Sequence, residues 1–240
     1  MAEKQRTLNS PVKFSGVGLH TGEKVNVEIV PAAANHGYKF QRMDLDGAPV
    51  INADCDLVVA TDRGTTLEQH GARVYTTEHI LAALYACQVD NALIKIDGPE
   101  IPIMDGSSKP FVDLIENHGI EVQNKKRKVL NVKKVIEVKS NQSSAKIMPN
   151  NQFSIDFEID FPSQLVSKQS CQLQLINGNY KSDIAAARTF GFEKDVEYLR
   201  ANGLALGGSL DNAVVVGENK ILNKDGLRYT DEFVRHKILD

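Results

Sequence analysis

The stretch Phe153-Ser154-Ile155-Asp156-Phe157-Glu158-Ile159-Asp160-Phe161 is the clearest structural signal in this chain of 240 residues. Large apolar residues occupy every second position, and polar residues occupy the positions between them. Because successive side chains of a strand point to opposite faces, the pattern predicts a β-strand with one buried face and one hydrated face.

Weaker patterns on both sides of this strand alternate between strand and helix. Four further segments are predicted strands: residues 25–29, 91–97, 129–138 and 212–216. Five segments are predicted helices: residues 76–87, which begin with a threonine that can cap the helix, then 108–116, 183–187, 192–200 and 231–240. Each half of the chain therefore reads as a sheet plus two helices, and the predicted fold class is α+β.

A polar, basic segment, Gln123-Asn124-Lys125-Lys126-Arg127-Lys128, separates the two halves. A run of Lys and Arg is also typical of a nucleic-acid patch or a localisation signal. The formal net charge of −3 argues against a nucleic-acid partner, and we interpret the run as a solvated connector. We place a domain boundary there, which gives a first domain over residues 1–124 and a second over residues 125–240.

Composition restricts the class of protein further. A hydrophobic content of 42% allows a sizeable core, and no run of about 20 apolar residues predicts a transmembrane helix. The N-terminal residues are polar and lack the apolar core of a signal peptide. Cys55, Cys87 and Cys171 are scattered without a Cys-x-x-Cys pair, which fits a reducing compartment. The expected location is the cytoplasm.

His236 and Asp240 are four residues apart in the last predicted helix, so they share one face of it, one turn apart. With His79 they form a set of two His and one carboxylate, which suits a catalytic zinc with an open fourth position. Glu78 could then act as the general base. Spacing alone leaves alternatives open: a surface His–Asp ion pair, or the facial triad of a non-haem iron oxygenase. A zinc peptidase is disfavoured because the chain lacks His-Glu-x-x-His.

Six short motifs follow one another along the chain. They are Gly16–Gly22, Thr77–Leu84, Glu100–Ser107, Ala187–Phe192, Gly207–Asn212 and Asp231–Asp240. Together they closely resemble the UDP-3-O-acyl-N-acetylglucosamine deacetylase family of lipid A biosynthesis, and the resemblance covers essentially the whole chain.

The resemblance implies a zinc hydrolase of two similar α+β domains, packed face to face with the active site between them. His79, His236 and Asp240 match the family's Zn²⁺ ligands, and Glu78 matches its general base. Zinc lowers the pKa of its bound water from about 15.7 to about 7. The implied reaction releases acetate from an acylated UDP-sugar, UDP-3-O-(3-hydroxyacyl)-N-acetylglucosamine, and leaves the free amine. This is the committed step of lipid A biosynthesis.

Further residues match family positions near the reacting group. Thr189 matches a hydroxyl that stabilises the tetrahedral oxyanion, although a threonine capping the next helix gives the same local pattern. The matched substrate-binding positions are Lys237, Phe190, Phe192, Gly208, Ser209, His20 and Phe161. For most of these, a solvated helix lysine or an ordinary core phenylalanine is the alternative reading.

The last predicted helix reaches Asp240 without a stop signal, so we expect it to continue. Family members continue into a segment with a further catalytic histidine, and the second domain is therefore expected to be incomplete here. The chain alone is expected to bind zinc weakly and turn over slowly, or to be an inactive fragment that only binds ligand. Some family members are fused to a downstream dehydratase domain, and the parent protein could be such a fusion.

Overall fold

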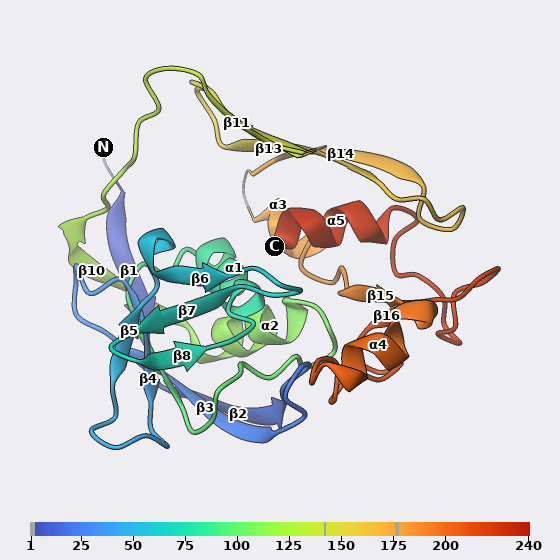
Figure 1. The fold of residues 1–240 in the computed structure, drawn as a ribbon. Coiled ribbons are helices and arrows are strands. Elements are labelled where there is room, and N and C mark those ends of the chain that lie inside the picture. Colours follow the sequence, from blue (N-terminus) through green and yellow to red (C-terminus); the bar gives the residue numbers. More distant parts are fainter. Residues whose placement is uncertain (1–2, 142, 176–177) are drawn as a thin grey trace.

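A five-stranded mixed sheet organises the first half of the chain (Figure 1). The computed structural model describes residues 3–141, 143–175 and 178–240. In spatial order the strands are β2 (Val12–Val17), β3 (Lys24–Pro31), β9 (Ala92–Ile96), β4 (Tyr38–Arg42) and β5 (Val50–Asn52). Strands β4 and β9 are parallel, and the other neighbours are antiparallel. The strands predicted over residues 25–29 and 91–97 are confirmed.

Two helices, α1 (Glu78–Ala86) and α2 (Lys109–His118), pack against each other, and α2 also contacts β2. The ring of Phe111 in α2 meets Phe14 of β2 edge to face, with centroids 5.4 Å apart. Apolar side chains that alternate along β3 and β9 join the helices in one buried core, which includes Val27, Ile94 and Ile80. The helices predicted over residues 76–87 and 108–116 are confirmed.

The predicted threonine cap of α1 is wrong, and α2 has no hydroxyl cap either. Thr77 precedes α1 and Ser108 precedes α2, and neither makes a side-chain capping hydrogen bond. Instead Thr76 donates its hydroxyl to Glu100 at 2.8 Å, and the hydroxyls of Ser108 and Tyr180 lie 3.0 Å apart. These hydroxyl groups therefore form hydrogen bonds with residues distant in the sequence instead of capping the helices, and no local pattern predicts such bonds.

Two smaller sheets complete the first half. One has three strands and follows a short 3₁₀ turn, η1 (Cys55–Leu57); its strands are β6 (Val58–Ala60), β7 (Thr66–Gln69) and β8 (Ala72–Val74). The other pairs β1 (Lys4–Leu8) with β10 (Ile120–Lys126) in antiparallel fashion.

The basic segment at residues 123–128 is largely solvent-exposed, as its composition suggested, but it is not a free connector. It continues β10 as far as Lys126, and the Gln123 amide donates to the Ala32 carbonyl at 2.7 Å. The Arg127 guanidinium forms an ion pair of 2.7 Å with Asp90. Strand pairing and this ion pair hold the segment against the first half, and the domain boundary at 124/125 stays a prediction.

The stretch that dominates the sequence forms β13 (Ser154–Asp160), and its strand prediction is confirmed. It pairs with β14 (Lys168–Gln174), and Figure 1 shows both strands lying over helix α5 (Glu232–Leu239). Ile159 of β13 is buried with Phe233 and Val234 of α5. In a separate sheet, β11 (Ile136–Ser140) pairs with β12 (Ser143–Ile147) in antiparallel fashion, so the strand predicted over residues 129–138 begins only at Ile136.

A parallel strand pair forms the rest of the second half. β15 (Phe190–Phe192) and β16 (Val214–Val216) are joined by a crossover through η2 (Glu193–Asp195) and α4 (Val196–Ala201). The helix predicted over residues 192–200 is shorter, because Phe192 ends β15 and the next three residues form η2 before α4 begins. The helix predicted over residues 183–187 instead lies at α3 (Asn179–Asp183).

The predicted α+β fold class is confirmed. Within its described residues, the second half carries two-stranded sheets and three α-helices, not one sheet with two helices. A single buried cluster crosses from one half to the other, joining Ile80 and Leu84 of α1 to Ile238 and Leu239 of α5. This packing fixes the end of α5 beside the beginning of α1.

No helix within the described ranges is both long enough and apolar enough to cross a lipid bilayer.

Gly106 is a point of close approach between the two halves. Its φ is +88°, and a Cβ added there would lie 2.2 Å from the carbonyl oxygen of Asn212. We expect Gly106→Ala to lower the free energy of unfolding by about 2–4 kcal/mol, since it combines left-handed strain with a backbone clash. Urea denaturation measures this loss.

Gly47→Ala is the matched control. Gly47 has a φ of +74°, and an added Cβ would meet no other atom within 4 Å in the described part of the chain. It should lose only about 1–2 kcal/mol, the conformational cost alone. Equal losses in the two variants would show that the approach to Asn212 does not matter.

Candidate metal and catalytic site

Two imidazoles and one carboxylate meet where α1 and α5 pack together. The Nε2 atoms of His79 and His236 lie 3.6 Å and 3.4 Å, respectively, from Oδ1 of Asp240. The two rings meet edge to face with centroids 5.1 Å apart. One ligand atom from each residue lies within 4.8 Å of the others, so a single ion could contact all three. The structure thus brings together the three residues proposed from sequence as metal ligands.

His236 is oriented by its own hydrogen bond. Its Nδ1 lies 3.0 Å from the carbonyl oxygen of Ala187. A carbonyl only accepts, so Nδ1 carries the proton and the Nε2 lone pair faces Asp240. His236 and His79 are 2% and 3% exposed. Within the described residues, the buried Nδ1 of His79 has no hydrogen-bond partner, and such a group is uncommon outside functional sites.

The charge states of His236 and Asp240 suit a divalent cation. Burial lowers the pKa of His236 to about 4, so its ring is neutral at pH 7. Burial alone would raise the pKa of Asp240, but His236, His79 and Lys237 together hold that pKa well below its usual range. Neutral imidazole nitrogens and an ionised carboxylate are the donors that zinc binds in proteins. The residues present therefore fit a zinc ion.

Glu78 is the first residue of α1, directly before His79, and its Oε2 accepts the Thr65 backbone N–H at 2.9 Å. Burial raises the pKa of this carboxyl, the charge of Asp240 adds to the effect, and His79 opposes it. A carboxylate with a raised pKa is a better proton acceptor than a solvated one.

Gly64 lies between Glu78 and His20. A Cβ added to Gly64 would lie 3.4 Å from Glu78 Oε1 and 3.7 Å from His20 Nε2. The His20 Nε2 also lies 3.1 Å from the Arg63 carbonyl oxygen, and its Nδ1 accepts the Ala205 N–H at 3.4 Å. The structure therefore brings His20 to the neighbourhood of Glu78.

A buried glutamate that the sequence reading left without a role supports this arrangement. Glu100 is fully buried, and its carboxylate accepts the backbone N–H groups of His20 and Thr21 and the Thr76 hydroxyl. It thus ties the glycine-rich turn to the residues just before Glu78. Its place in the Glu100–Ser107 motif was the only sequence signal for it.

The predicted aromatic residues form one cluster that reaches from His236 to a cavity. The Phe190 ring lies 6.4 Å from the His236 ring and 5.7 Å from the Phe161 ring, centroid to centroid. Phe161 and Phe192 are 5.8 Å apart. Both line a cavity of about 330 Å³ whose other walls are Arg63, Pro162, Ser163, Lys194 and Asp195. Arg63 and Lys194 are cationic residues that the sequence reading missed.

Lys237 points back toward the three-residue set. Its Nζ lies 2.8 Å from Asp240 Oδ2 and 5.8 Å from the centroid of the Phe190 ring. The side chain keeps 38% of its surface exposed, so the substrate contact of Lys237 stays a prediction.

Thr189 lies just before β15 and does not cap a helix, because α4 begins at Val196 after Asp195. Its backbone N–H donates to the Gly106 carbonyl at 2.7 Å, and its carbonyl accepts the Val214 N–H at 2.8 Å. The residues on either side of the Arg188–Thr189 pair, Ala187 and Phe190, both contact His236. Thr189 therefore belongs to the segment that passes this ring.

Gly208 and Ser209 lie in the loop between α4 and β16, and their backbone N–H groups make local hydrogen bonds. The Gly208 N–H donates to Ala205 at 3.2 Å, and the Ser209 N–H donates to Asn212 at 2.8 Å. Among the described residues, these contacts form a turn and do not bring the pair to the His79 cluster.

Comparisons with known proteins identify the family of this chain. Residues 5–240 match the family model described as UDP-3-O-acyl N-acetylglycosamine deacetylase. A protein of Citrifermentans bemidjiense named UDP-3-O-acyl-N-acetylglucosamine deacetylase is 48% identical over 236 residues, which are 98% of this chain and 77% of the relative. A protein of Idiomarina loihiensis with the same name is 49% identical over 240 residues, 99% of this chain and 78% of the relative. The chain therefore belongs to the UDP-3-O-acyl N-acetylglycosamine deacetylase family and is, as a member of it, a hydrolytic enzyme.

Proposed function

We propose that this chain is a cytoplasmic zinc-dependent deacetylase of lipid A biosynthesis. Its substrate is UDP-3-O-(3-hydroxyacyl)-N-acetylglucosamine, and its products are acetate and the free amine. One observation carries the proposal: in a member of this family, the Nε2 atoms of His79 and His236 converge on Asp240 Oδ1.

His79, His236 and Asp240 are the proposed zinc ligands. Bound zinc would supply Lewis acidity, which polarises an amide carbonyl and lowers the pKa of water. Ala187 keeps His236 in the tautomer that a metal needs, because its carbonyl accepts the proton on Nδ1. Lys237 occupies Oδ2 of Asp240 and leaves Oδ1 facing the imidazoles.

Glu78 is the proposed general base. As the oxygen of water bonds to the acetyl carbon, Glu78 takes a proton from that water, and the proton then passes to the nitrogen as the C–N bond breaks. The burial that raises the pKa of Glu78 favours both the uptake and the storage of this proton. Thr189 is the proposed hydroxyl donor to the oxyanion, a role worth roughly 3–4 kcal/mol of transition-state stabilisation at comparable sites.

The aromatic cluster is the proposed binding region for the non-reacting parts of the substrate. Phe190 and Phe192 would contact the 3-O-acyl chain together with the loop of Gly208 and Ser209. Phe161 would face the uridine, and the cavity of about 330 Å³ beside it supports this placement. His20 and Lys237 would contact the glucosamine, since His20 lies near Glu78 and Lys237 lies beside Asp240.

We further propose that residues 1–124 and 125–240 are two α+β domains that pack face to face around the active site. The position of the proposed ligands supports this division. His79 lies in α1 of the first unit. His236 lies in α5 of the second unit, and Asp240 directly follows that helix.

Metal removal tests the proposal. Protein treated with a chelator should release no acetate from the acylated UDP-sugar, and added Zn²⁺ should restore the rate of the untreated protein, measured by quantifying acetate and the free amine. If Fe²⁺ restored the activity and turnover required oxygen, the non-haem iron oxygenase alternative would be favoured instead. Substrate binding without acetate release in the zinc-loaded protein would contradict the deacetylase proposal and support a ligand-binding role.

A further inference from the structure

A buried carboxylate stands at the first turn of α5, on the helix face of the proposed metal ligands. Glu232 is fully buried. Glu232, His236 and Asp240 follow one another at intervals of four residues, so they share one face of the helix. Any rotation of α5 that moves one of them therefore moves the other two.

The Glu232 carboxylate is fully engaged by two arginines. Its Oε1 accepts the Arg188 backbone N–H at 3.0 Å and Nε at 2.8 Å. Its Oε2 accepts Nη2 of Arg188 at 3.1 Å and the Arg228 backbone N–H at 2.6 Å. This bidentate pairing fixes the orientation of the carboxylate as well as its distance from Arg188, because the guanidinium is planar.

The same short segment contacts α5 a second time. Arg188 holds Glu232, and its neighbour Ala187 accepts the Nδ1 proton of His236 one helical turn further on. Two contacts one turn apart fix both the rotation and the axial position of α5. We call the pairing of Glu232 with Arg188 and Arg228 the clamp. Because Arg188 is adjacent to Thr189, the clamp also sets the position of the proposed oxyanion donor.

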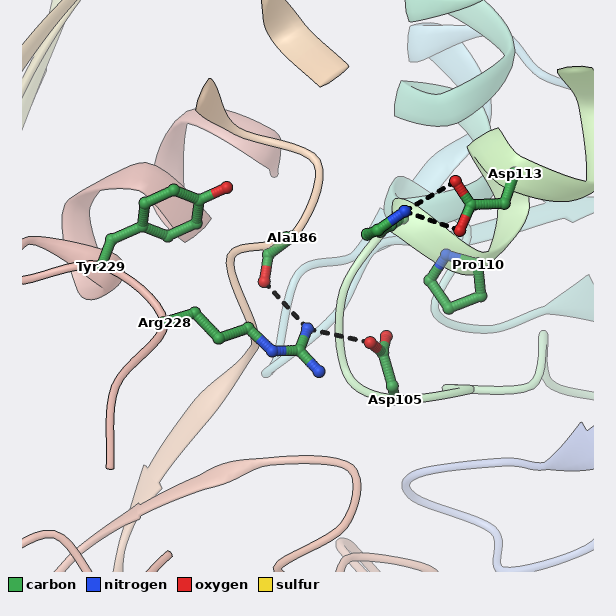
Figure 2. A pocket seen from close by; sticks show the side chains of 7 residues that line it. Asp105, Pro110, Asp113, Ala186, Arg228 and Tyr229 are labelled. Atoms are coloured by element: carbon green, nitrogen blue, oxygen red, sulfur yellow. Dashed lines mark hydrogen bonds and ion pairs between the residues drawn. The ribbon is translucent and has the colours of Figure 1, made fainter. Parts of the chain in front are cut away.

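The clamp continues into the first half of the chain, as Figure 2 shows. The Arg228 guanidinium contacts Asp105 at 2.8 Å and the Ala186 carbonyl at 3.0 Å. The next residue, Gly106, accepts the Thr189 N–H. These contacts tie α5 to the half of the chain that carries His79.

The cavity of about 550 Å³ around Arg228 belongs to this clamp. Its two cationic side chains are both paired. Arg228 pairs with Asp105 (Figure 2), and Lys109 pairs with Asp113. A cavity whose charges already neutralise one another has little to offer a charged ligand.

We propose that Glu232 is a positioning residue for the metal site. Through Arg188 and Arg228 it holds α5 in the one orientation that brings His236 Nε2 and Asp240 Oδ1 to His79. A buried ion pair adds little net stability, because the cost of removing its charges from water offsets their attraction. Its contribution here is geometric. This inference rests on the proposed zinc-dependent function.

The test uses a double variant that leaves no unpaired buried charge. Arg188→Met with Glu232→Gln removes both charges and should fold, as judged by circular dichroism and thermal melting. We expect its zinc affinity, measured by chelator competition, to fall about 10–100-fold, the usual effect of losing a supporting partner. The visible spectrum of the Co²⁺-loaded protein should also change, because it reports the geometry of the ligands.

Asp231→Asn is the matched control, because it breaks the 2.6 Å ion pair with Arg235 at the same end of α5. That pair lies outside the clamp, so zinc affinity and the Co²⁺ spectrum should equal those of the wild type. A folded double variant with the zinc affinity and Co²⁺ spectrum of the wild type would overturn this inference but leave the proposed function standing. Should the double variant not fold, Glu232→Asp, which keeps the charge but shortens the reach, decides by the same two measurements. Wild-type protein that binds no zinc would overturn the inference and the proposed function together.

Discussion

Glu78→Gln is expected to retain zinc and to slow acetate release about 10²–10⁴-fold. The amide cannot accept the proton of the attacking water, yet its oxygen can still accept the Thr65 N–H that holds the carboxylate now. Because Glu78 lies outside the set of three converging ligand atoms, the metal should remain bound. Steady-state assays together with metal analysis of the purified variant measure both effects.

Glu197→Gln provides the control for this substitution. Glu197 is also in the first turn of a helix, α4, but its side chain is exposed. Its rate and zinc content should match those of the wild type. A Glu78→Gln variant that loses zinc as completely as a ligand variant does would contradict the base role.

His79→Ala is expected to lose both the metal and the activity. His79 supplies one of the three proposed ligand atoms from a side chain that is almost fully buried, and alanine supplies none. Zinc affinity should fall by more than about 100-fold, beyond the loss caused by removing a supporting partner. Acetate release at low zinc should then fall to the uncatalysed background.

His118→Ala separates this effect from the general loss of an imidazole. His118 lies at the end of α2. Within the described residues, its Nδ1 has one hydrogen-bond partner, the Leu114 carbonyl of the same helix. The control should keep its zinc and its rate. Stoichiometric zinc in His79→Ala, with the fold intact by circular dichroism, would contradict the ligand assignment.

Much of the fold follows from local patterns. The alternation over residues 153–161 predicts β13, and the apolar stripe after Thr77 predicts α1. The four-residue spacing of His236 and Asp240 places them on one face of α5, as the structure shows. These predictions succeed because each depends on the geometry of one element.

Other features depend on tertiary contacts and cannot be read from a local pattern. Glu100 and Glu232 are charged residues, which are expected at the surface, yet partners from distant segments hold both in the interior. The basic segment at residues 123–128 likewise has partners that are distant in the sequence. Its strand residues pair with β1, and Arg127 pairs with Asp90. The meeting of His79 with His236 was proposed from residue types and a family resemblance, because no spacing rule joins residues so far apart.

Anomalous diffraction at the zinc absorption edge from crystals of the zinc-loaded protein tests the central assignment most directly. We predict one strong peak per chain, about 2.0–2.2 Å from the Nε2 atoms of His79 and His236 and from a carboxylate oxygen of Asp240. A peak bound by other residues, or no peak between α1 and α5, would contradict the assignment.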